Sequence, residues 1–146
     1  MAQEKVLLLI DNTVYSERAA AFTVKLLKAN HDFKATMLFA GTHREIVPDV
    51  PGAGWISDRE FTKLFQERAE TAFQKALAIF QREGFGVQTL MDYGDPVEVV
   101  TRLVREDGYG LVVVGGKETG DRLNYVLSSN AYRLTHLLHI PMVVVK

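Results

Sequence analysis

Three consecutive polar residues, Asp11, Asn12 and Thr13, follow the first strongly apolar run of the chain and open a helical pattern. A carboxylate at this position can accept hydrogen bonds from a sugar hydroxyl or from the amino group of a base. The same carboxylate can instead cap its own turn by accepting nearby backbone N–H groups. The residue types alone leave both interpretations open.

A second polar segment follows a later apolar run and combines glycines, a lysine and the start of a helix. Glycines let backbone amides approach a phosphate, and a helix N-terminus offers free N–H groups and the positive end of its dipole. The alternative is a loop followed by an ordinary N-cap serine. The candidate residues of this segment are Gly115, Lys117, Glu118, Ser128, Ser129 and Asn130.

Several well-defined catalytic and phosphate-binding motifs are absent. The Walker A order of Gly-x4-Gly-Lys-[Ser/Thr] does not occur, and a Rossmann fingerprint would follow the first strand. There is no Gly-x-Ser-x-Gly elbow and no defensible nucleophile–base pair. His136 and His139 have no Asp, Glu or Cys near them in sequence, so we expect no metal site.

The elements that must position these residues alternate along the chain. Continuous apolar runs at 6–10, 111–114 and 142–145 are typical of strands buried on both faces of a parallel sheet. Weaker strands are predicted at 35–40 and 87–92, and the latter mixes polar and apolar residues as an edge strand would. Helical patterns fall between them. The four helices are expected to begin near Ser16, at Ser57 (capping box with Glu60), at Asp95 (N-cap before Pro96) and at Ser128.

The resulting βαβαβαβαβ order predicts an α/β fold, an open doubly wound five-stranded parallel sheet with helices on both faces. Ligands of such sheets bind beyond the carboxyl ends of the strands, where the strand order reverses. This directs attention to Asp11 and to the segments after Ala40 and Val114. The connections at 41–56 and 116–127 are longer than simple turns, which is typical of functional or mobile loops.

Composition narrows the class of protein further. The chain has 146 residues, the usual size of one domain, so residues 1–146 are expected to form a single domain. A net charge of −1 gives no electrostatic reason to expect nucleic acid or a membrane as partner. There is no cysteine, no room for a signal peptide before the first strand, and no apolar run of membrane-spanning length. We therefore expect a cytoplasmic protein.

Taken in order, these features resemble the universal stress protein family. The opening Asp11-Asn12-Thr13, followed by Ser16 and Ala19, is similar to the family's Asp-Gly-Ser-x-x-Ser-x-x-Ala. Gly94-Asp95-Pro96 looks like the family's Gly-x-Pro before the third helix. The segments 111–115 and 140–145 resemble its last two strands, so the resemblance covers essentially the whole chain.

The resemblance implies an adenine-nucleotide alpha hydrolase-like sheet of strand order 3-2-1-4-5 and a site for ATP or another adenine nucleotide, with Mg²⁺. It implies that Asp11 contacts the adenosine part of the nucleotide and that Phe39 and Ala40 lie by the adenine. Nucleotide-binding members carry Gly-x2-Gly-x9-Gly-[Ser/Thr] after the fourth strand. Here Gly115 and Ser129 match that pattern, whereas Glu118 and Ser128 replace its second and third glycines.

The replacement by Glu118 is the more serious change, because a carboxylate a few Å from a phosphate is repulsive by about 1 kcal/mol or more unless a cation intervenes. Two hypotheses follow. The chain is either a stress-response domain that binds an adenine nucleotide, with slow hydrolysis at most, or a dimeric interaction module that does not bind ATP.

The family commonly dimerises through its last strand. Here that strand is Met142, Val143, Val144 and Val145, an apolar edge with little blunting except Lys146. A phosphoacceptor receiver domain is a much weaker alternative, because receivers carry an acidic pair after the first strand and Asp11 stands alone.

Overall fold

The computed structural model describes residues 4–47, 56–116 and 127–146. Its five strands all pair in parallel, in the order β3-β2-β1-β4-β5. This confirms the predicted open sheet and the edge position of the mixed strand. The strands are β1 (Glu4–Leu9), β2 (Phe33–Gly41), β3 (Gln88–Tyr93), β4 (Leu111–Gly115) and β5 (Met142–Val145).

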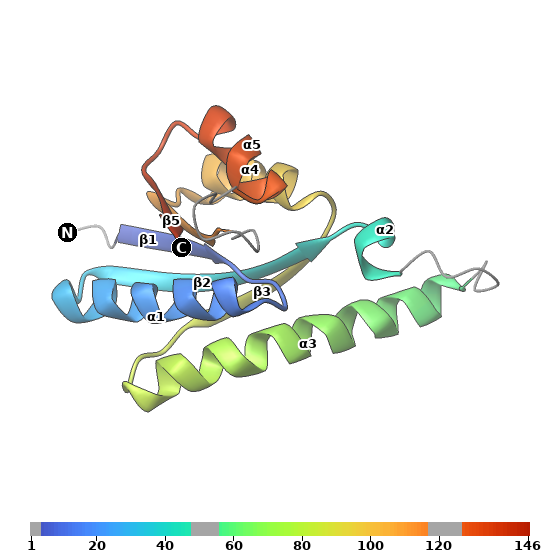
Figure 1. The fold of residues 1–146 in the computed structure, drawn as a ribbon, viewed down its shortest axis with the longest axis horizontal. Helices are drawn as coiled ribbons and strands as arrows, with labels where there is room; N and C mark the ends of the chain where they lie inside the picture. The colour runs from blue at the N-terminus through green and yellow to red at the C-terminus, as the bar shows by residue number, and fades with distance from the viewer. Residues whose placement is uncertain (1–3, 48–55, 117–126) are drawn as a thin grey trace.

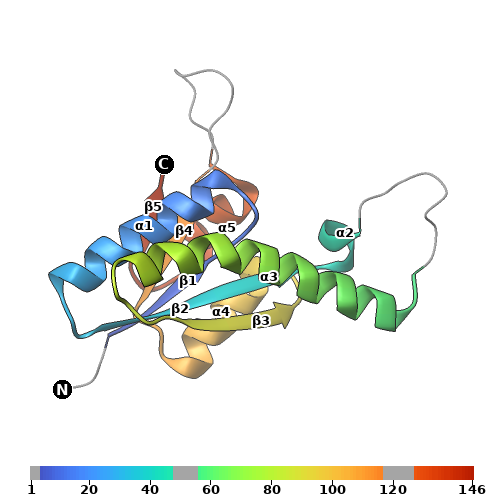
Figure 2. The same cartoon turned by 90° about the horizontal axis from the view of Figure 1, so that it is seen from below.

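Helices cover both faces of the sheet, as predicted. In Figure 1, α1 and α3 lie on one face and α4 and α5 on the other, and in Figure 2 α1 and α3 run side by side. The helices are α1 (Val14–Ala29), α2 (His43–Ile46), α3 (Asp58–Arg82), α4 (Pro96–Asp107) and α5 (Ser129–Leu137). None of the helices within the described ranges has the length and apolar character needed to cross a bilayer.

The central strands supply both apolar layers. Val6 and Leu8 face the layer with α1 and α3, whereas Leu7 faces the layer with α4 and α5. All three side chains are fully buried. Because successive residues of a strand point to opposite faces, burial on both faces requires a continuous apolar run rather than an alternating one.

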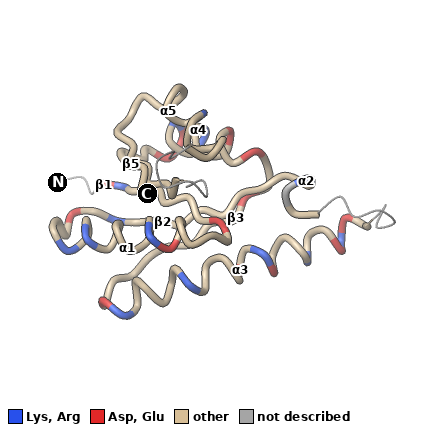
Figure 3. Tube along the Cα trace, viewed as in Figure 1, with Lys and Arg blue, Asp and Glu red and all other residues tan. Residues whose placement is uncertain are grey.

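The long helix α3 begins and ends where its sequence predicts. Ser57 is the N-cap: the Glu60 backbone N–H donates to its hydroxyl at 3.2 Å, and that hydroxyl donates to the Glu60 carboxylate at 3.0 Å. Gly84, two residues past the last helical residue, adopts φ +76°, a conformation that favours glycine. Charged residues of both signs are interspersed along α1 and α3, and the N-terminal part of α3 extends past the sheet beside α2 (Figures 1 and 3).

Two boundaries differ from the sequence prediction. Helix α1 begins at Val14 rather than near Ser16, because Thr13 accepts a hydrogen bond from the Ser16 backbone N–H at 3.4 Å and so serves as its N-cap. The segment 41–56 is not simply a loop, because β2 continues to Gly41 and is followed by α2. Residues 48–55, and residues 117–126 of the second long connection, lie outside the described part of the chain.

The short helix α2 owes its position to one buried side chain. Ile46 is only 4% exposed, and a Cβ placed on Gly41 would lie 3.1 Å from Ile46 Cδ1. The turn of helix therefore packs its one apolar residue on the end of β2. Four residues are too few to show helical periodicity, which is why the sequence pattern did not predict this helix.

At Gly115, the last residue of β4, the sheet lies very close to the backbone of α1. A Cβ placed on Gly115 would lie 2.6 Å from both the carbonyl carbon and the oxygen of Tyr15 in α1. Backbone atoms cannot give way as a flexible side chain can. Gly115 is therefore required for packing, whatever it contributes to ligand binding.

We predict that Gly115→Ala lowers the free energy of unfolding by about 1–3 kcal/mol, since it forces β4 and α1 apart. Urea denaturation measures the loss. Gly86→Ala is the matched control, because a Cβ at Gly86 meets nothing within 4 Å and should leave stability nearly unchanged. Equal stability of the two variants would contradict the close approach.

Candidate functional site

The turn after β1 is held by the carboxylate of Asp11. Its Oδ1 accepts from the Thr13 backbone N–H at 3.0 Å and from the Thr13 hydroxyl at 2.5 Å. The Ser16 hydroxyl donates to the Asp11 carbonyl oxygen at 2.9 Å. The carboxylate thus caps its own turn, which is one of the two interpretations that the sequence allowed.

The capping role uses only part of the carboxylate. Asp11 is exposed, and no hydrogen bond to its second oxygen, Oδ2, comes from any residue that the structure describes. A carboxylate carries about four acceptor positions. The turn and a ligand can therefore be served by the same side chain, one through each oxygen.

A cavity of about 180 Å³ opens beside this turn, at the carboxyl ends of β1 and β2. We call it the Asp11 cavity. The strand order reverses between β1 and β4, and the cavity shares β1 with that pair, but its described lining comes from the β1, β2 and α3 side and includes no residue of β4. Its walls bring together four of the candidates that sequence analysis singled out and three further residues: Asp11, Asn12, Phe39, Ala40, Gly41, Ile46 and Arg68.

The ring of Phe39 belongs to the core more than to a ligand surface. Phe39 is 7% exposed, and its ring meets Phe65 and Phe73 edge-on, at centroid distances of 5.4 and 6.4 Å. Both neighbours come from α3. The ring is consequently anchored between β2 and α3, so that it supports the cavity wall without offering a free face for stacking.

Arg68 is the charged residue among the three lining residues that the sequence did not single out. It lies on an exposed part of α3, and within the described residues its guanidinium forms no salt bridge. Arg68 lies off the apolar face of α3, so the sequence pattern indicates only that it faces solvent. Only the tertiary position of α3 over the end of β2 brings this charge to the cavity.

The start of α5 follows the ordinary pattern of a capped helix. Ser128 is the N-cap, and its hydroxyl accepts from the Ala131 backbone N–H at 3.1 Å. Ser129 is exposed and Asn130 is half-buried. The backbone N–H groups of the first turn of a helix have no hydrogen-bond partner within that helix. These three residues do not line the Asp11 cavity. Lys117 and Glu118 lie outside the described residues.

A salt bridge ties α5 to the beginning of α4. Arg133 donates to both carboxylate oxygens of Asp95, with Nη1–Oδ1 3.0 Å and Nη2–Oδ2 2.5 Å. Asp95 is the N-cap residue of α4 and Pro96 its first residue, as the sequence predicts, and the Asp95 carboxylate is held chiefly by Arg133. The bidentate fork of an arginine binds a carboxylate more strongly than a single backbone N–H does. The hydrogen bond from Arg133 is the main cause that lowers the pKa of Asp95, against the opposing effect of partial burial.

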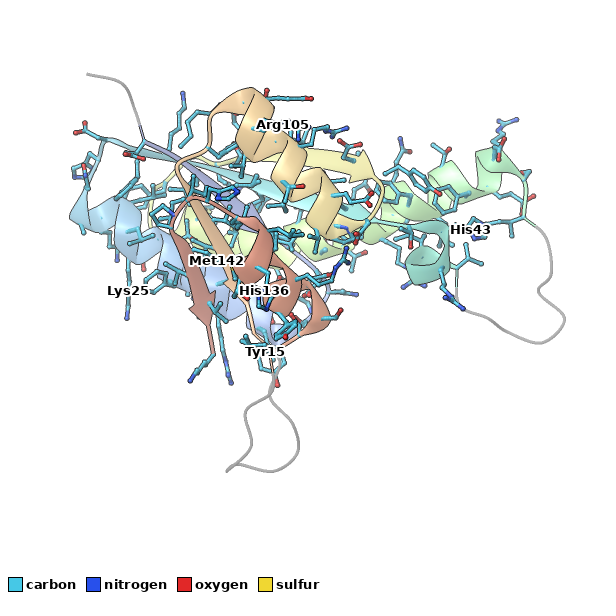
Figure 4. The ribbon with its side chains drawn as sticks, turned by 90° about the horizontal axis from the view of Figure 1, so that it is seen from above. Tyr15, Lys25, His43, Arg105, His136 and Met142 are labelled. Atoms are coloured by element: carbon cyan, nitrogen blue, oxygen red, sulfur yellow. The ribbon has the colours of Figure 1, made fainter. Side chains whose placement is uncertain are left out.

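A second cavity, of about 410 Å³, lies on the other side of α2, and we call it the aromatic cavity. His43 stacks on Phe61 with ring centroids 5.0 Å apart, and Tyr93 meets Phe61 edge-on at 5.5 Å. Figure 4 shows His43 at α2, beside the N-terminal part of α3. The residues that line the aromatic cavity are His43, Asp58, Phe61, Thr62, Phe65 and Tyr93.

The parallel sheet of order 3-2-1-4-5, with a carboxylate and a cavity at the carboxyl ends of β1 and β2, defines the class of open α/β folds that bind ligands at the carboxyl edge. Within that class, the model of the universal stress protein family matches residues 3–146, and the chain belongs to this family. The resemblance seen in the sequence is thereby confirmed.

Solved structures of the family share the fold at low sequence identity. A family protein from Burkholderia pseudomallei has a TM-score of 0.72 and 19% identity, covering 99% of this chain and 96% of that one. The Archaeoglobus fulgidus universal stress protein in complex with dAMP has a TM-score of 0.65 and 15% identity, covering 100% of both chains. An Arabidopsis thaliana family protein with AMP bound has a TM-score of 0.63 and 18% identity, covering 98% and 91%. No curated protein sequence matches the chain.

We predict that the contribution of Asp95 to stability is lost in acid. Its pKa in the folded protein lies below the ordinary 3.8, so the stabilisation is present above that value and disappears as the pH falls through the folded pKa. Asp95→Asn should therefore be less stable than the parent at pH 7, with a difference that narrows from pH 5 to pH 3. Urea titrations at each pH measure it.

Asp32→Asn serves as the control for this titration, because Asp32 is exposed and its carboxylate forms no salt bridge with a described residue. A gap between Asp95→Asn and the parent that stays constant from pH 7 to pH 3 would contradict the role of the ion pair.

Proposed function

We propose that this chain binds an adenine nucleotide in the Asp11 cavity and acts as a binding switch in a stress response. The observation that carries the proposal is the convergence of Asp11, Phe39 and Ala40 on one cavity at the carboxyl ends of β1 and β2. The dAMP and AMP complexes of the two relatives support it, because those proteins share the fold and the family. No general base stands out among the described residues that line the cavity, so the proposal is one of binding rather than of rapid turnover.

The size of the cavity determines how much of a nucleotide it can enclose. At about 180 Å³ it is smaller than the roughly 300–1,000 Å³ of typical small-molecule sites. The base and ribose would occupy it, and the phosphate would lie at its mouth, beside the exposed Arg68. In this arrangement Asp11 Oδ2 accepts from a ribose hydroxyl or from the base amine, while Oδ1 continues to hold the turn.

Two charged residues set the preference among nucleotides. Arg68 offers a guanidinium without an ion-pair partner among the described residues, suited to a phosphate through charge-assisted hydrogen bonds. Glu118 stands at the second glycine position of the family motif, where a carboxylate opposes the phosphates of a triphosphate. We therefore propose that AMP binds more tightly than ATP, and that Mg²⁺ reduces the difference by screening Glu118.

A second function, a dimeric interaction module, is favoured by the outer strand β5. This strand is at the sheet edge, and its four residues, Met142–Val145, are all half-buried rather than buried. An unpaired apolar edge is a template for pairing with another chain. We propose dimerisation through β5, which is compatible with nucleotide binding at the carboxyl edge. The cytoplasmic location stays a prediction from composition.

Calorimetric titration with AMP, cyclic AMP and ATP, with and without Mg²⁺, tests the nucleotide proposal. We expect saturable binding of AMP and weaker binding of ATP. Asp11→Asn should weaken AMP binding about tenfold, because it removes a charged acceptor while an amide oxygen can still hold the turn. Absence of heat with every nucleotide at millimolar concentration would leave only the interaction module.

Arg68→Gln tests the phosphate contact separately. We expect weaker binding of AMP and unchanged binding of adenosine, because only the nucleotide carries the phosphate. Arg59→Gln is the matched control, an exposed arginine of the same helix that does not line the cavity. Equal loss for AMP and adenosine in Arg68→Gln would show that the arginine contacts the nucleoside instead.

A further inference from the structure

A third cavity, of about 370 Å³, lies at the opposite edge of the sheet from Asp11, and the residues that line it within the described part of the chain all have polar side chains. We call it the lysine cavity. Lys5 of β1 pairs in register with Lys34 of β2, and Thr36 of β2 pairs in register with Gln88 of β3. Residues in register or two apart on a strand face the same way, so all four lie on one face of the sheet. The lining residues are Lys5, Lys34, Thr36 and Gln88.

That face is the one covered by α4 and α5. Leu7 and Leu38, each two residues beyond a cavity residue on its strand, pack in the same layer as the buried residues of α4. The four cavity residues lie in the amino-terminal halves of β1, β2 and β3. The lysine cavity is therefore separate from the Asp11 cavity, which lies at the carboxyl ends.

The hydroxyl of Thr36 is buried without a partner. Thr36 is 6% exposed, and its side chain forms no hydrogen bond with any residue that the structure describes. Leaving a buried hydroxyl unsatisfied is unfavourable, because the group has given up its hydrogen bonds with water. A side chain that lines a cavity and lacks a partner within the protein is positioned to bond something that enters the cavity.

The two lysines carry positive charge that no described carboxylate neutralises. Lys34 is exposed, and neither lysine has an acidic oxygen within 4.0 Å among residues 4–47, 56–116 and 127–146. Lys5 is held in place, because its Nζ donates to the backbone carbonyl of Asp107 at 2.5 Å and lies 4.4 Å from the ring centroid of Tyr109. An ammonium has three donors, so Lys5 retains the capacity to bond an anion.

From this combination we infer that the lysine cavity binds the phosphate group of a small phosphate monoester. Two ammonium groups supply the charge, and the Thr36 hydroxyl and the Gln88 amide supply neutral donors directed at the same space. Like charges on neighbouring strands repel, and a dianion between them reverses that repulsion. A volume within the roughly 300–1,000 Å³ of small-molecule sites leaves room for an organic group beyond the phosphate.

The test is a titration of the isotopically labelled protein with glycerol 3-phosphate, followed through backbone-amide NMR shifts. We expect saturable shifts around Lys5, Lys34–Thr36 and Gln88, and no comparable shifts with glycerol. Glycerol 3-phosphate carries no base, so this outcome does not depend on nucleotide binding at Asp11. Shifts confined to the carboxyl edge, or no saturation at 20-fold to 100-fold excess of ligand, would overturn the proposal.

Three variants separate the phosphate site from a purely structural role. Lys34→Gln should weaken binding about tenfold or more while leaving thermal stability unchanged or raised, because it also relieves the repulsion with Lys5. Thr36→Val keeps the shape of the side chain, removes the hydroxyl and should weaken binding as well. Lys25→Gln changes the charge equally on α1, across the sheet (Figure 4), and should bind as the parent does. Equal affinity of Lys34→Gln and Lys25→Gln would refute the site.

Discussion

The constraint on which this structure depends is that its central strands are buried on both faces. Leu7, Leu8, Val112 and Val113 have no measurable exposure, so the middle of β1 and β4 can carry no polar group. Polar groups that could bind a ligand are therefore confined to the two ends of the sheet, where its strands begin or end. The Asp11 cavity lies at the carboxyl edge and the lysine cavity at the amino edge, and the apolar layers keep both in fixed positions.

At the carboxyl edge, the residues that suggest ligand binding also hold the fold together. Asp11 caps the turn into α1, Ser128 caps α5, and Gly115 allows β4 to approach Tyr15. A structural role does not remove a ligand role, because Asp11 retains a second oxygen. It does mean that the presence of these residues is weaker evidence for nucleotide binding than the convergence of Asp11, Phe39 and Ala40 on one cavity.

The sequence was sufficient to predict the helices and strands, which depend on local residue patterns. It was not sufficient to predict contacts between residues that are far apart in the chain. The apolar runs predicted the five strands, and the Ser57–Glu60 pair predicted the start of α3. Both features depend only on residues that are close together in the sequence. The sequence predicted Asp95 as the N-cap of α4, which the structure confirms, but it could not predict the salt bridge of Asp95 with Arg133, which is 38 residues away. Arg68 and Thr36 were missed for the same reason: each acquires its importance from a strand or helix remote in sequence.

The most direct measurement of the central claim is a crystal structure of the protein grown with AMP. The account predicts adenosine in the Asp11 cavity, with Asp11 Oδ2 within hydrogen-bond distance of the ribose or the base and Arg68 turned towards the phosphate. AMP bound instead in the aromatic cavity, against Phe61 and Tyr93, would contradict it, as would crystals in which millimolar AMP leaves the Asp11 cavity without ligand density.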